Sequence, residues 1–410
     1  MNKKFFHLFI VSLLLSYFTV LAERPITVLY VFDQPWKDQA VRFTMATGIP
    51  VNYIDVPFAQ LRQMMVVAFA AGSSDYDVIH LRDDWVLEFA TNGWLTPLDE
   101  LLPRDFWDQF PRSAVEAMTV DGHIYGIPRY FWLWQFYYNV EMLEARGFEA
   151  PPRTWAELVE MAQALTDPAQ GLWGYVEPWG PTFAAVPFII HLRAEGGEYW
   201  DFATNRPTFN SEAGVRALQR MVDMYQKFKI VPDVAFQLDG TGPVAELFVA
   251  GTVAMCMNTP HTYPMSQNPE LSKVAGKVKV SLIPGSVLPS ASYCETGAVG
   301  IPWFSKNKNA ALEYCKFVTS PSEQIIIALE LGRIPTVYEA ATDPRVLEKY
   351  PHFALAFEQM QYPARMDAVP QATKIREIVS AEIIAAIKGL KTPAQALSDA
   401  EKQVLKLLGK

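Results

Sequence analysis

Cysteine and histidine are scarce in this sequence, which has three cysteines and six histidines among 410 residues. Because three is an odd number, the chain can hold at most one internal disulfide, and the sequence does not choose the pair from Cys256, Cys294 and Cys315. Cys256 lies in the apolar run 253–257, where burial as a small hydrophobic residue is expected and soft-metal binding is the alternative. Since the sequence also lacks Cys-x-x-Cys and His-Glu-x-x-His motifs and a Gly-rich phosphate loop, we expect neither a metal nor a cofactor.

Clusters of basic residues are lacking beyond the first few positions, and the formal net charge is −9. Binding to nucleic acids depends on Lys and Arg side chains that release counterions from phosphates. The sequence offers no such patch, so we expect no DNA or RNA partner.

The chain is long and strongly apolar, with 50% hydrophobic and 19% charged residues. A single core stops growing at about 250 to 300 residues, so 410 residues predict two lobes. The 25 Phe, 17 Tyr and 11 Trp exclude intrinsic disorder, which requires low hydrophobicity. No tandem repeat, low-complexity tract or Gly/Ser linker is present, so we expect several chain crossings between the lobes instead of one tether.

The first residues have the pattern of a secretory signal peptide. Lys3 and Lys4 precede an apolar run from Phe5 to Leu21. Ala22 follows this run at a position suited to a signal peptidase. We expect residues 1–22 to be cleaved and the mature chain to be periplasmic and monomeric. An uncleaved anchor is the alternative, although polar residues interrupt the run and a span usually needs about 20 apolar residues.

The next segments alternate between strand and helix patterns. Strands are predicted at 26–32, 51–56 and 77–81, separated by helices that end near residues 47 and 71. This alternation is typical of a mostly parallel sheet covered by helices on both faces. Capping boxes that begin at Thr154, Ser320 and Thr392 predict three further helix starts.

A series of short motifs covers nearly the whole mature chain. In order, they are Asp77-Val78-Ile79, Trp85-Val86-Leu87-Glu88-Phe89, Gly93-Trp94-Leu95-Thr96-Pro97-Leu98-Asp99, Asp121-Gly122-His123-Ile124-Tyr125-Gly126-Ile127-Pro128, Tyr137-Tyr138-Asn139, Pro152-Arg153-Thr154-Trp155-Ala156-Glu157-Leu158, Gly196-Gly197-Glu198, Phe209-Asn210-Ser211, Phe248 with Gly251 and Ala254-Met255, Ser305-Lys306-Asn307-Lys308 and Thr392-Pro393-Ala394-Gln395-Ala396-Leu397. In this order and spacing, the motifs resemble those of the family 1 extracellular solute-binding proteins of ABC importers, the group of maltose-binding and trehalose/maltose-binding proteins.

The resemblance implies a two-lobe α/β fold, with each lobe a mostly parallel sheet flanked by helices and the ligand in a cleft at the hinge. We expect one lobe at 23–132 plus 286–338 and the other at 133–285 plus 339–410, with the third crossing near 335–342. The implied function is that of the substrate-binding component of an ABC importer, which captures a sugar or sugar derivative and delivers it to a membrane permease.

Aromatic residues suit such a cleft, because flat rings cover the apolar faces of a polar solute while polar groups replace its water. Along segment 129–138, strand alternation would point Tyr130, Trp132 and Trp134 to one side. A buried strand without ligand contact is the alternative.

Three further tryptophans, Trp36, Trp85 and Trp179, lie at strand ends or on loops that would face the other lobe. For each of them an ordinary core position is the alternative. The candidate ligand-binding residues are Gln34, Trp36, Arg82, Asp83, Trp85, Tyr130, Trp132, Trp134, Trp179, Glu295 and Arg365.

The sequence departs from the family at positions where sugar-binding members commonly carry carboxylates. Arg82 and Trp132 occupy two such positions, Thr259 replaces a usual tryptophan, and Thr296-Gly297-Ala298, after Glu295, replaces a Gly-Gly-Trp loop. These changes disfavour a plain neutral oligosaccharide.

A guanidinium in the cleft would bind carboxylate or phosphate through two hydrogen bonds. Arg82, with Arg129 or Arg365 as helpers, therefore favours an acidic or acid-substituted sugar. The alternative is that Arg82 pairs with Asp83 or Asp84 on the rim.

A different class of function, an exported glycoside hydrolase, would use two cleft carboxylates. Asp83, Asp84 and Glu295 are its only candidates, and no nucleophile elbow accompanies them. A binding protein needs the same carboxylates, so we expect no enzyme.

Overall fold

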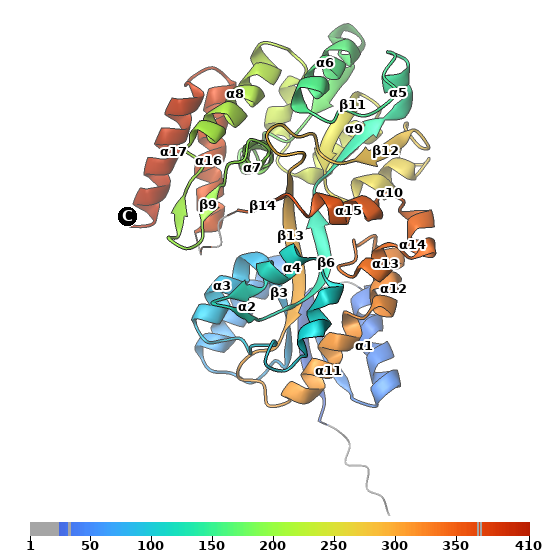
Figure 1. Ribbon diagram of the computed structural model, residues 1–410, viewed down its shortest axis with the longest axis vertical. Helices are drawn as coiled ribbons and strands as arrows, with labels where there is room; N and C mark the ends of the chain where they lie inside the picture. The colour runs from blue at the N-terminus through green and yellow to red at the C-terminus, as the bar shows by residue number, and fades with distance from the viewer. Residues whose placement is uncertain (1–23, 32–33, 367–368, 370) are drawn as a thin grey trace, which may run out of the picture.

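Two groups of sheets and helices lie one above the other in the computed structural model, which describes residues 24–31, 34–366, 369 and 371–410 (Figure 1). The predicted signal peptide lies outside the described residues. We call the half with the sheet that contains β1 the first lobe, and the half with the sheet that contains β11 the second lobe. The two-lobe α/β fold predicted from the sequence is confirmed.

The first lobe is built on a mixed sheet with the order β14-β13-β3-β1-β2, in which β6 also pairs with β13. Its strands are β1 (Ile26–Val31), β2 (Val51–Val56), β3 (Val78–Arg82), β6 (Ile127–Leu133), β13 (Ser292–Gly300) and β14 (Pro363–Ala364). β1 is parallel to β2 and β3, whereas β13 is antiparallel to β3 and β6. Successive residues of β1 serve two cores on opposite faces: Val28 and Tyr30 pack in one and Leu29 in the other.

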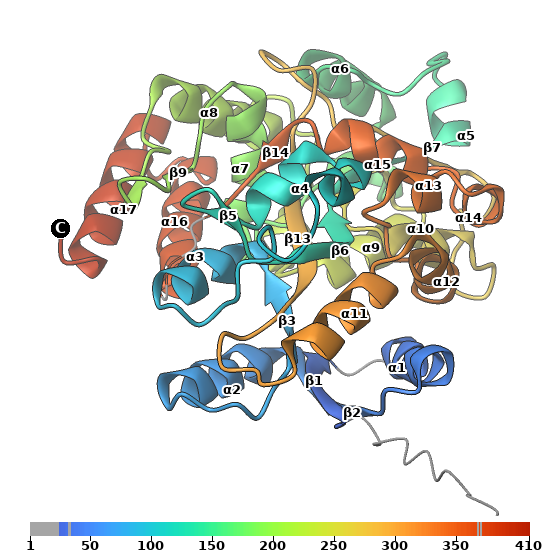
Figure 2. The same cartoon turned by 60° about the horizontal axis from the view of Figure 1, so that its bottom comes forward.

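Helices cover both faces of this sheet, and Figure 2 shows α1 and α2 on opposite sides of β1 and β2. The helices of this lobe are α1 (Gln34–Thr47), α2 (Phe58–Ala70), α3 (Asp83–Thr91), α4 (Arg112–Ala117), α11 (Lys308–Val318), α12 (Pro321–Leu331), α13 (Tyr338–Ala341), α14 (Pro344–Lys349) and α15 (Phe353–Gln359), with a 3-10 turn at Arg104–Gln109 and the hairpin β4 (Thr119–Val120) and β5 (His123–Ile124).

The second lobe has a sheet of order β12-β7-β11-β8. Its strands are β7 (Gln135–Asn139), β8 (Trp173–Val176), β11 (Val253–Asn258) and β12 (Val278–Ser281), with a small separate pair of β9 (Trp200–Asp201) and β10 (Arg206–Pro207). Its helices are α5 (Val140–Glu144), α6 (Trp155–Leu165), α7 (Ala185–Ala194), α8 (Glu212–Gln226), α9 (Thr241–Val249), α10 (Thr262–Gln267), α16 (Ala372–Ile387) and α17 (Pro393–Leu407), with 3-10 turns at Pro168–Gln170 and Asp233–Gln237.

Strand direction in the second sheet differs from the mostly parallel arrangement that we predicted. β7 is antiparallel to both β11 and β12, whereas β11 and β8 are parallel. Trp134 alone separates β6 of the first sheet from β7, so the chain enters the second sheet without a crossover helix.

The three predicted capping boxes differ in how far they form. The Thr154 box is complete, and the Thr392 side chain accepts a hydrogen bond from the backbone N–H three residues later. The prediction for Ser320 is wrong, because its side chain caps no backbone group. The expected partner Glu323 instead forms an ion pair with Arg42, at 2.7 Å from Nη2 to Oε2.

All three cysteines are free and buried. Cys256 packs inside the core of the second lobe, as its apolar neighbours in the sequence predicted. Burial raises the pKa of Cys256 well above its usual value and raises the pKa values of Cys294 and Cys315 to about 12. These thiols therefore stay protonated and act as small apolar side chains.

The segment that follows α12 packs with the first lobe. Ala340, Val346 and Phe353 on α13, α14 and α15 are buried in the same core as Val28 of β1. The chain next pairs with β13 through β14, and α16 then packs on α7 and α8. We therefore propose that the third crossing lies at β14, later than the division at 338/339 predicted from the sequence.

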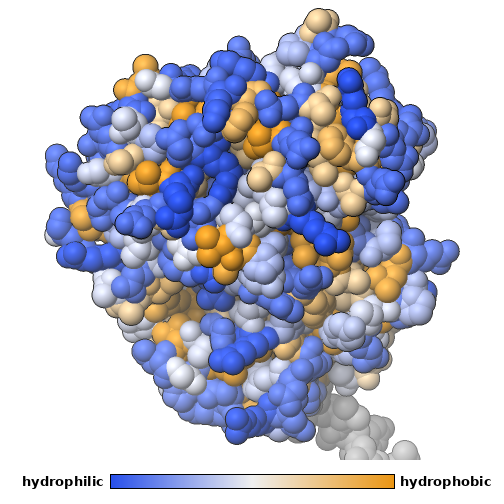
Figure 3. Space-filling model, turned by 45° about the horizontal axis from the view of Figure 1, so that its top comes forward, coloured by the Kyte–Doolittle hydropathy of each residue, from blue (hydrophilic) through white to orange (hydrophobic). Residues whose placement is uncertain are grey.

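The face of the molecule in Figure 3 is mainly hydrophilic, and its apolar side chains form small scattered groups. Isolated apolar residues are normal on a protein surface. Within the described residues, no helix combines the length and apolar character needed to cross a bilayer.

Replacement of Gly174 by alanine should destabilise the second lobe. Gly174 in β8 lies against α6, and an added Cβ would lie 2.1 Å from the Ala162 carbonyl oxygen, so α6 would have to move. We expect Gly174→Ala to lower the free energy of unfolding by about 3 kcal/mol or more, measured by urea denaturation. The matched control is Gly242→Ala in α9, where a Cβ meets no atom within 4 Å, and which should leave stability unchanged or slightly higher. Equal stability of the two variants would contradict this account of the packing.

Candidate ligand-binding site

A cavity of about 580 Å³ lies where the two lobes meet. The first lobe contributes the end of β3, the start of α3 and the β4 turn, β13 contributes residues 293–295, and the chain after β14 and the start of α16 close the other side. Five predicted site residues line this cavity, namely Arg82, Asp83, Trp85, Glu295 and Arg365. The volume suits a small polar solute.

The register of three strands places four of the predicted residues on one face of the sheet. Glu295 of β13 lies directly opposite Trp132 of β6, and Gly297 of β13 lies opposite both Tyr130 of β6 and Arg82 of β3. Side chains that are directly opposite in an antiparallel pair share a face. A Cβ at Gly297 would lie 2.3 Å from the Tyr130 ring, so the Tyr130 ring fills the space that a side chain at this position would need.

Arg82 is paired with two carboxylates. Its Nε and Nη2 donate to the two oxygens of Asp84 at 2.9 and 3.2 Å, and Nη2 also lies 2.8 Å from Glu295 Oε1. The Tyr293 hydroxyl donates to the same Glu295 oxygen at 2.7 Å. The pairing with Asp84 was the alternative that the sequence left open, and it removes the basis for expecting Arg82 to bind an anionic ligand.

Asp83 lies beside this ion-pair cluster, at the first position of α3. Its carboxylate accepts hydrogen bonds from the backbone N–H groups of Thr296 and Asp84, both at 3.0 Å. Burial raises the pKa of Asp83 to about 7, and the nearby Asp84 and Glu295 add to the rise, which Arg82 only partly opposes. Asp83 therefore exchanges its proton near neutral pH.

Negative groups outnumber positive groups around the cavity. The carboxylates are Asp83, Asp84, Glu116, Asp121 and Glu295, and the guanidiniums are Arg82, Arg365 and Arg376. Carboxylates accept hydrogen bonds from hydroxyl groups, so this wall suits a polyhydroxylated ligand. In the described part of the chain, no group of three His, Cys, Asp or Glu side chains is arranged to hold a metal ion.

Three predicted tryptophans pack in the cores and do not line the cavity. Trp36 on α1 lies under the Arg129 guanidinium at 4.0 Å, and Trp134 stacks on Phe183. These positions are the alternative that the sequence left open. Gln34, also predicted, is exposed at the start of α1, where it donates to Asp38 at 2.8 Å.

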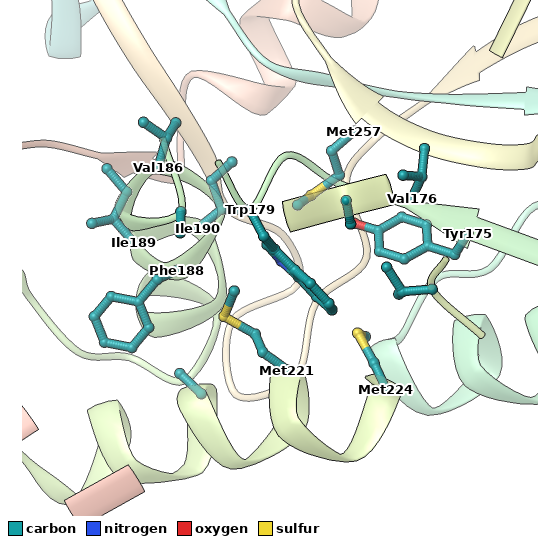
Figure 4. Packing of buried hydrophobic residues seen from close by; sticks show 14 of the residues in the cluster. Tyr175, Val176, Trp179, Val186, Phe188, Ile189, Ile190, Met221, Met224 and Met257 are labelled. Carbon is teal, nitrogen blue, oxygen red and sulfur yellow. The ribbon is translucent and has the colours of Figure 1, made fainter. Parts of the chain in front are cut away.

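Trp179 is the third of these tryptophans and lies in the core of the second lobe. Figure 4 shows its indole beside Met221, Met224 and Met257, and its Nε1 donates to Glu177 at 2.8 Å. The burial of Trp179 could not be predicted from its neighbours in the sequence, a proline and a glycine. The burial depends on the packing of α7 and α8 around the loop.

Tyr130 and Trp132 lie next to two residues that the sequence did not single out. The Arg333 guanidinium lies 4.6 Å from the Trp132 ring centroid and 5.5 Å from that of Tyr130. His261 stacks on Trp132 with centroids 6.4 Å apart, and its Nδ1 lies 2.7 Å from the Thr259 hydroxyl. The one available signal was that Arg333 lies two residues before Pro335, near a predicted crossing, which does not indicate a cleft side chain.

Comparison with known proteins identifies the relatives of the chain. The family model described as bacterial extracellular solute-binding protein matches residues 38–355. A protein of Sinorhizobium fredii named "Probable amino-acid ABC transporter periplasmic-binding protein" is 27% identical over 377 residues, which cover 88% of this chain and 83% of the relative. The maltotriose-binding protein of Pyrococcus abyssi is 26% identical over 302 residues, covering 72% of this chain and 62% of the relative.

Solved structures of solute-binding proteins share the fold of this chain. The maltose-bound MalE3 structure from T. maritima superimposes with a TM-score of 0.76 at 27% identity, and the match covers 94% of this chain and 99% of that chain.

The raised pKa of Asp83 predicts a specific pH dependence of stability. An unfolded Asp has a pKa near 3.9, so between about pH 4 and 7 the folded protein binds a proton at Asp83 that the unfolded chain has lost. The contribution of Asp83 to the free energy of unfolding is therefore full below pH 4 and is lost as the pH rises through 7. Asp83→Asn, which does not titrate, should lose less stability than the wild type between pH 5 and 8, measured by urea denaturation.

The matched control is Asp343→Asn. Arg345 lowers the pKa of Asp343 to about 2, so this group does not titrate between pH 5 and 8. Its variant should keep the wild-type pH dependence. The same slope in Asp83→Asn and the wild type would show that Asp83 is ionised throughout the range.

Proposed function

The chain belongs to the bacterial extracellular solute-binding protein family, and from this premise we propose that its interlobe cavity captures a sugar or polyol for the permease of an ABC importer. The observation that carries the proposal is a cavity between two lobes with an indole, carboxylates and guanidiniums in its walls. Such a site replaces the water around a hydroxylated solute and covers its apolar faces. The printed names of several relatives, which include maltotriose-binding and mannitol-binding proteins, support this ligand class.

We assign the capture of ligand to residues from both lobes. Arg82, Asp83 and Glu295 would accept and donate hydrogen bonds on the side of the first lobe and β13, and Arg365 would do so beyond β14. Trp132 would present its ring from the same face of the sheet as Glu295. The carboxylates already held by Arg82 are fixed in place, so their orientation costs little entropy on binding.

Closure of the lobes would follow from the position of the cavity. A ligand that touches both walls makes all its contacts only when the lobes are together, and it therefore shifts the population towards the closed state. The shift is limited by the difference in affinity between closed and open forms. The closed form would be the one that docks on the permease.

We further propose that the protein is not an enzyme and that it is exported to the periplasm after cleavage of residues 1–22. Asp84 and Glu295, two of the carboxylates that a glycosidase would need, are ion-paired with the same guanidinium. Glycoside hydrolysis needs a protonated carboxyl beside a free carboxylate. The raised pKa of Asp83 could supply the first, but both neighbouring candidates for the second are held by Arg82, which supports binding better than catalysis.

A thermal-shift screen tests the proposal directly. Maltose, maltotriose, mannitol and a set of amino acids would each be added to the purified mature chain at millimolar concentration. A ligand at 100 times its Kd adds about 2.7 kcal/mol to the free energy of unfolding, which gives a clear rise in Tm. We expect a rise with at least one sugar or polyol, whereas a rise with amino acids alone would favour the ligand class in the name of the Sinorhizobium relative.

Trp132→Ala should weaken binding of the sugar that this screen identifies by about 1 to 3 kcal/mol, because the indole would no longer cover an apolar face of the ligand. Calorimetry measures the loss, and the cooperative melt of the variant should remain because Trp132 is only partly buried. The matched control is Trp303→Ala, an exposed tryptophan beside Lys308 and outside the row of Glu295 and Trp132, which should bind normally. Normal binding by Trp132→Ala would remove Trp132 from the proposed site.

A further inference from the structure

Arg333 is held in place by an extra strand-like segment that pairs with β6. The Phe131 N–H donates to the Ile334 carbonyl at 2.9 Å, and these two residues form an antiparallel bridge. Two residues on, the Thr336 hydroxyl donates to the Pro128 carbonyl at 2.9 Å. The bridge and the residues that follow it are therefore held along the edge of β6.

This pairing sets the direction of the Arg333 side chain. In an antiparallel bridge between residues 131 and 334, residue 333 lies opposite residue 132. Since Trp132 lies opposite Glu295 on its other side, the three side chains form one row across the sheet, in the order Glu295, Trp132, Arg333. The 4.6 Å between the guanidinium and the Trp132 ring agrees with this row.

The charges of Arg333 and Arg82 are compensated differently. Arg82 is paired with Asp84 and Glu295, whereas none of the ion pairs among residues 24–31, 34–366, 369 and 371–410 includes Arg333. The Arg333 Nε is buried and has no hydrogen-bond partner there. Ring faces attract a cation but do not accept the directional hydrogen bonds that a guanidinium donates.

Other positive groups nearby do not take this role. Arg129 also lacks a carboxylate in the described structure, but it is buried over the rings of Tyr30 and Trp36 and donates to Gln39. Burial, with Arg333 nearby, lowers the pKa of His261, so its ring is neutral at pH 7. Among the described residues, Arg333 therefore brings a partly exposed positive charge to this side of Trp132 that neither Arg129 nor His261 provides.

We propose that Arg333 receives an anionic group of the transported solute, so that the ligand is a sugar or polyol bearing a carboxylate or phosphate. Of this row only Glu295 lines the cavity, so the hydroxyls of the ligand meet Glu295 there, and its ring or chain extends beyond the cavity along Trp132 to bring its anionic group to Arg333. The inference rests on the proposed function and makes its ligand class more specific. It also moves recognition of an acid from Arg82, where the sequence suggested it, to a residue with an unpartnered donor.

Matched sets of probes test the proposal by calorimetry. The sets are D-glucose with D-glucuronate and D-glucose 6-phosphate, D-galactose with D-galacturonate, and D-mannitol with mannitol 1-phosphate. For the mature wild type we expect the charged member of at least one set to bind at least tenfold more tightly than its neutral partner. This preference should shrink as NaCl is raised from 50 to 500 mM, because salt screens the ion pair.

Variants then assign the preference to Arg333. Arg333→Gln should reduce the ratio of charged-probe affinity to neutral-probe affinity at least tenfold. Its affinity for the neutral probe should stay nearly unchanged. Arg333→Lys should keep part of the preference, because an ammonium retains the charge without the planar pair of donors. The matched control is Arg345→Gln, an exposed arginine paired with Asp343, which should behave as the wild type. Thermal melts of all variants report whether each is folded.

The outcomes separate this inference from the proposed function. If neutral members bind as tightly as charged ones in every set, or if the preference survives in both Arg333 variants, the inference is wrong and the proposed function stands. If no member of any set binds, and maltose and maltotriose also fail, both are wrong. Preference for glucuronate over the phosphates, or the reverse, identifies the kind of anion.

Discussion

The register of β13 between β3 and β6 is the constraint on which the site depends. This strand pairs with β6 along residues 294–299 and with β3 along residues 297–300, and the register places Arg82, Tyr130, Trp132 and Glu295 on one face. A shift of β13 by one residue would turn Glu295 to the other face of the sheet, away from Arg82, Tyr130 and Trp132. Gly297 is part of the same constraint, because any larger residue would collide with the Tyr130 ring.

The charged groups on this face of the sheet separate into a negative side and a positive side. On one side, the ion pairs of Arg82 lie beside Asp83, and negative groups are in excess. On the other side, Arg333 lies over the rings of Tyr130 and Trp132 with no carboxylate partner among the described residues. An indole between groups of opposite sign gives the site a direction, so a ligand with unlike ends would bind in one orientation.

Much of the fold could be predicted from local patterns. The strand predicted at 26–32 appears as Ile26–Val31, with Phe32 outside the described residues, and the strand predicted at 51–56 has the predicted bounds. Arg82 is the last residue of β3, and Asp83 and Trp85 lie in the first turn of α3 directly after it, so all three lie at the cavity because this strand ends there.

The remaining details depend on contacts between distant segments. The sequence around Trp179 does not report that α7 and α8 bury its indole, and the Ser320 cap failed because Glu323 pairs with Arg42 from another helix. Arg333 gave no motif at all, since its position depends on a single bridge to β6. Side chains whose environment comes from one strand or turn were predictable, and those placed by pairing across the chain were not.

The burial of all three thiols has a practical consequence for labelling chemistry. Thiol-reactive probes attack the thiolate, and a buried thiol with a raised pKa presents almost none of it at neutral pH. A cysteine introduced on an exposed rim position would thus be the reactive site without removal of the native ones. A fluorophore attached there would report, through its changing surroundings, the approach of the two lobes in real time.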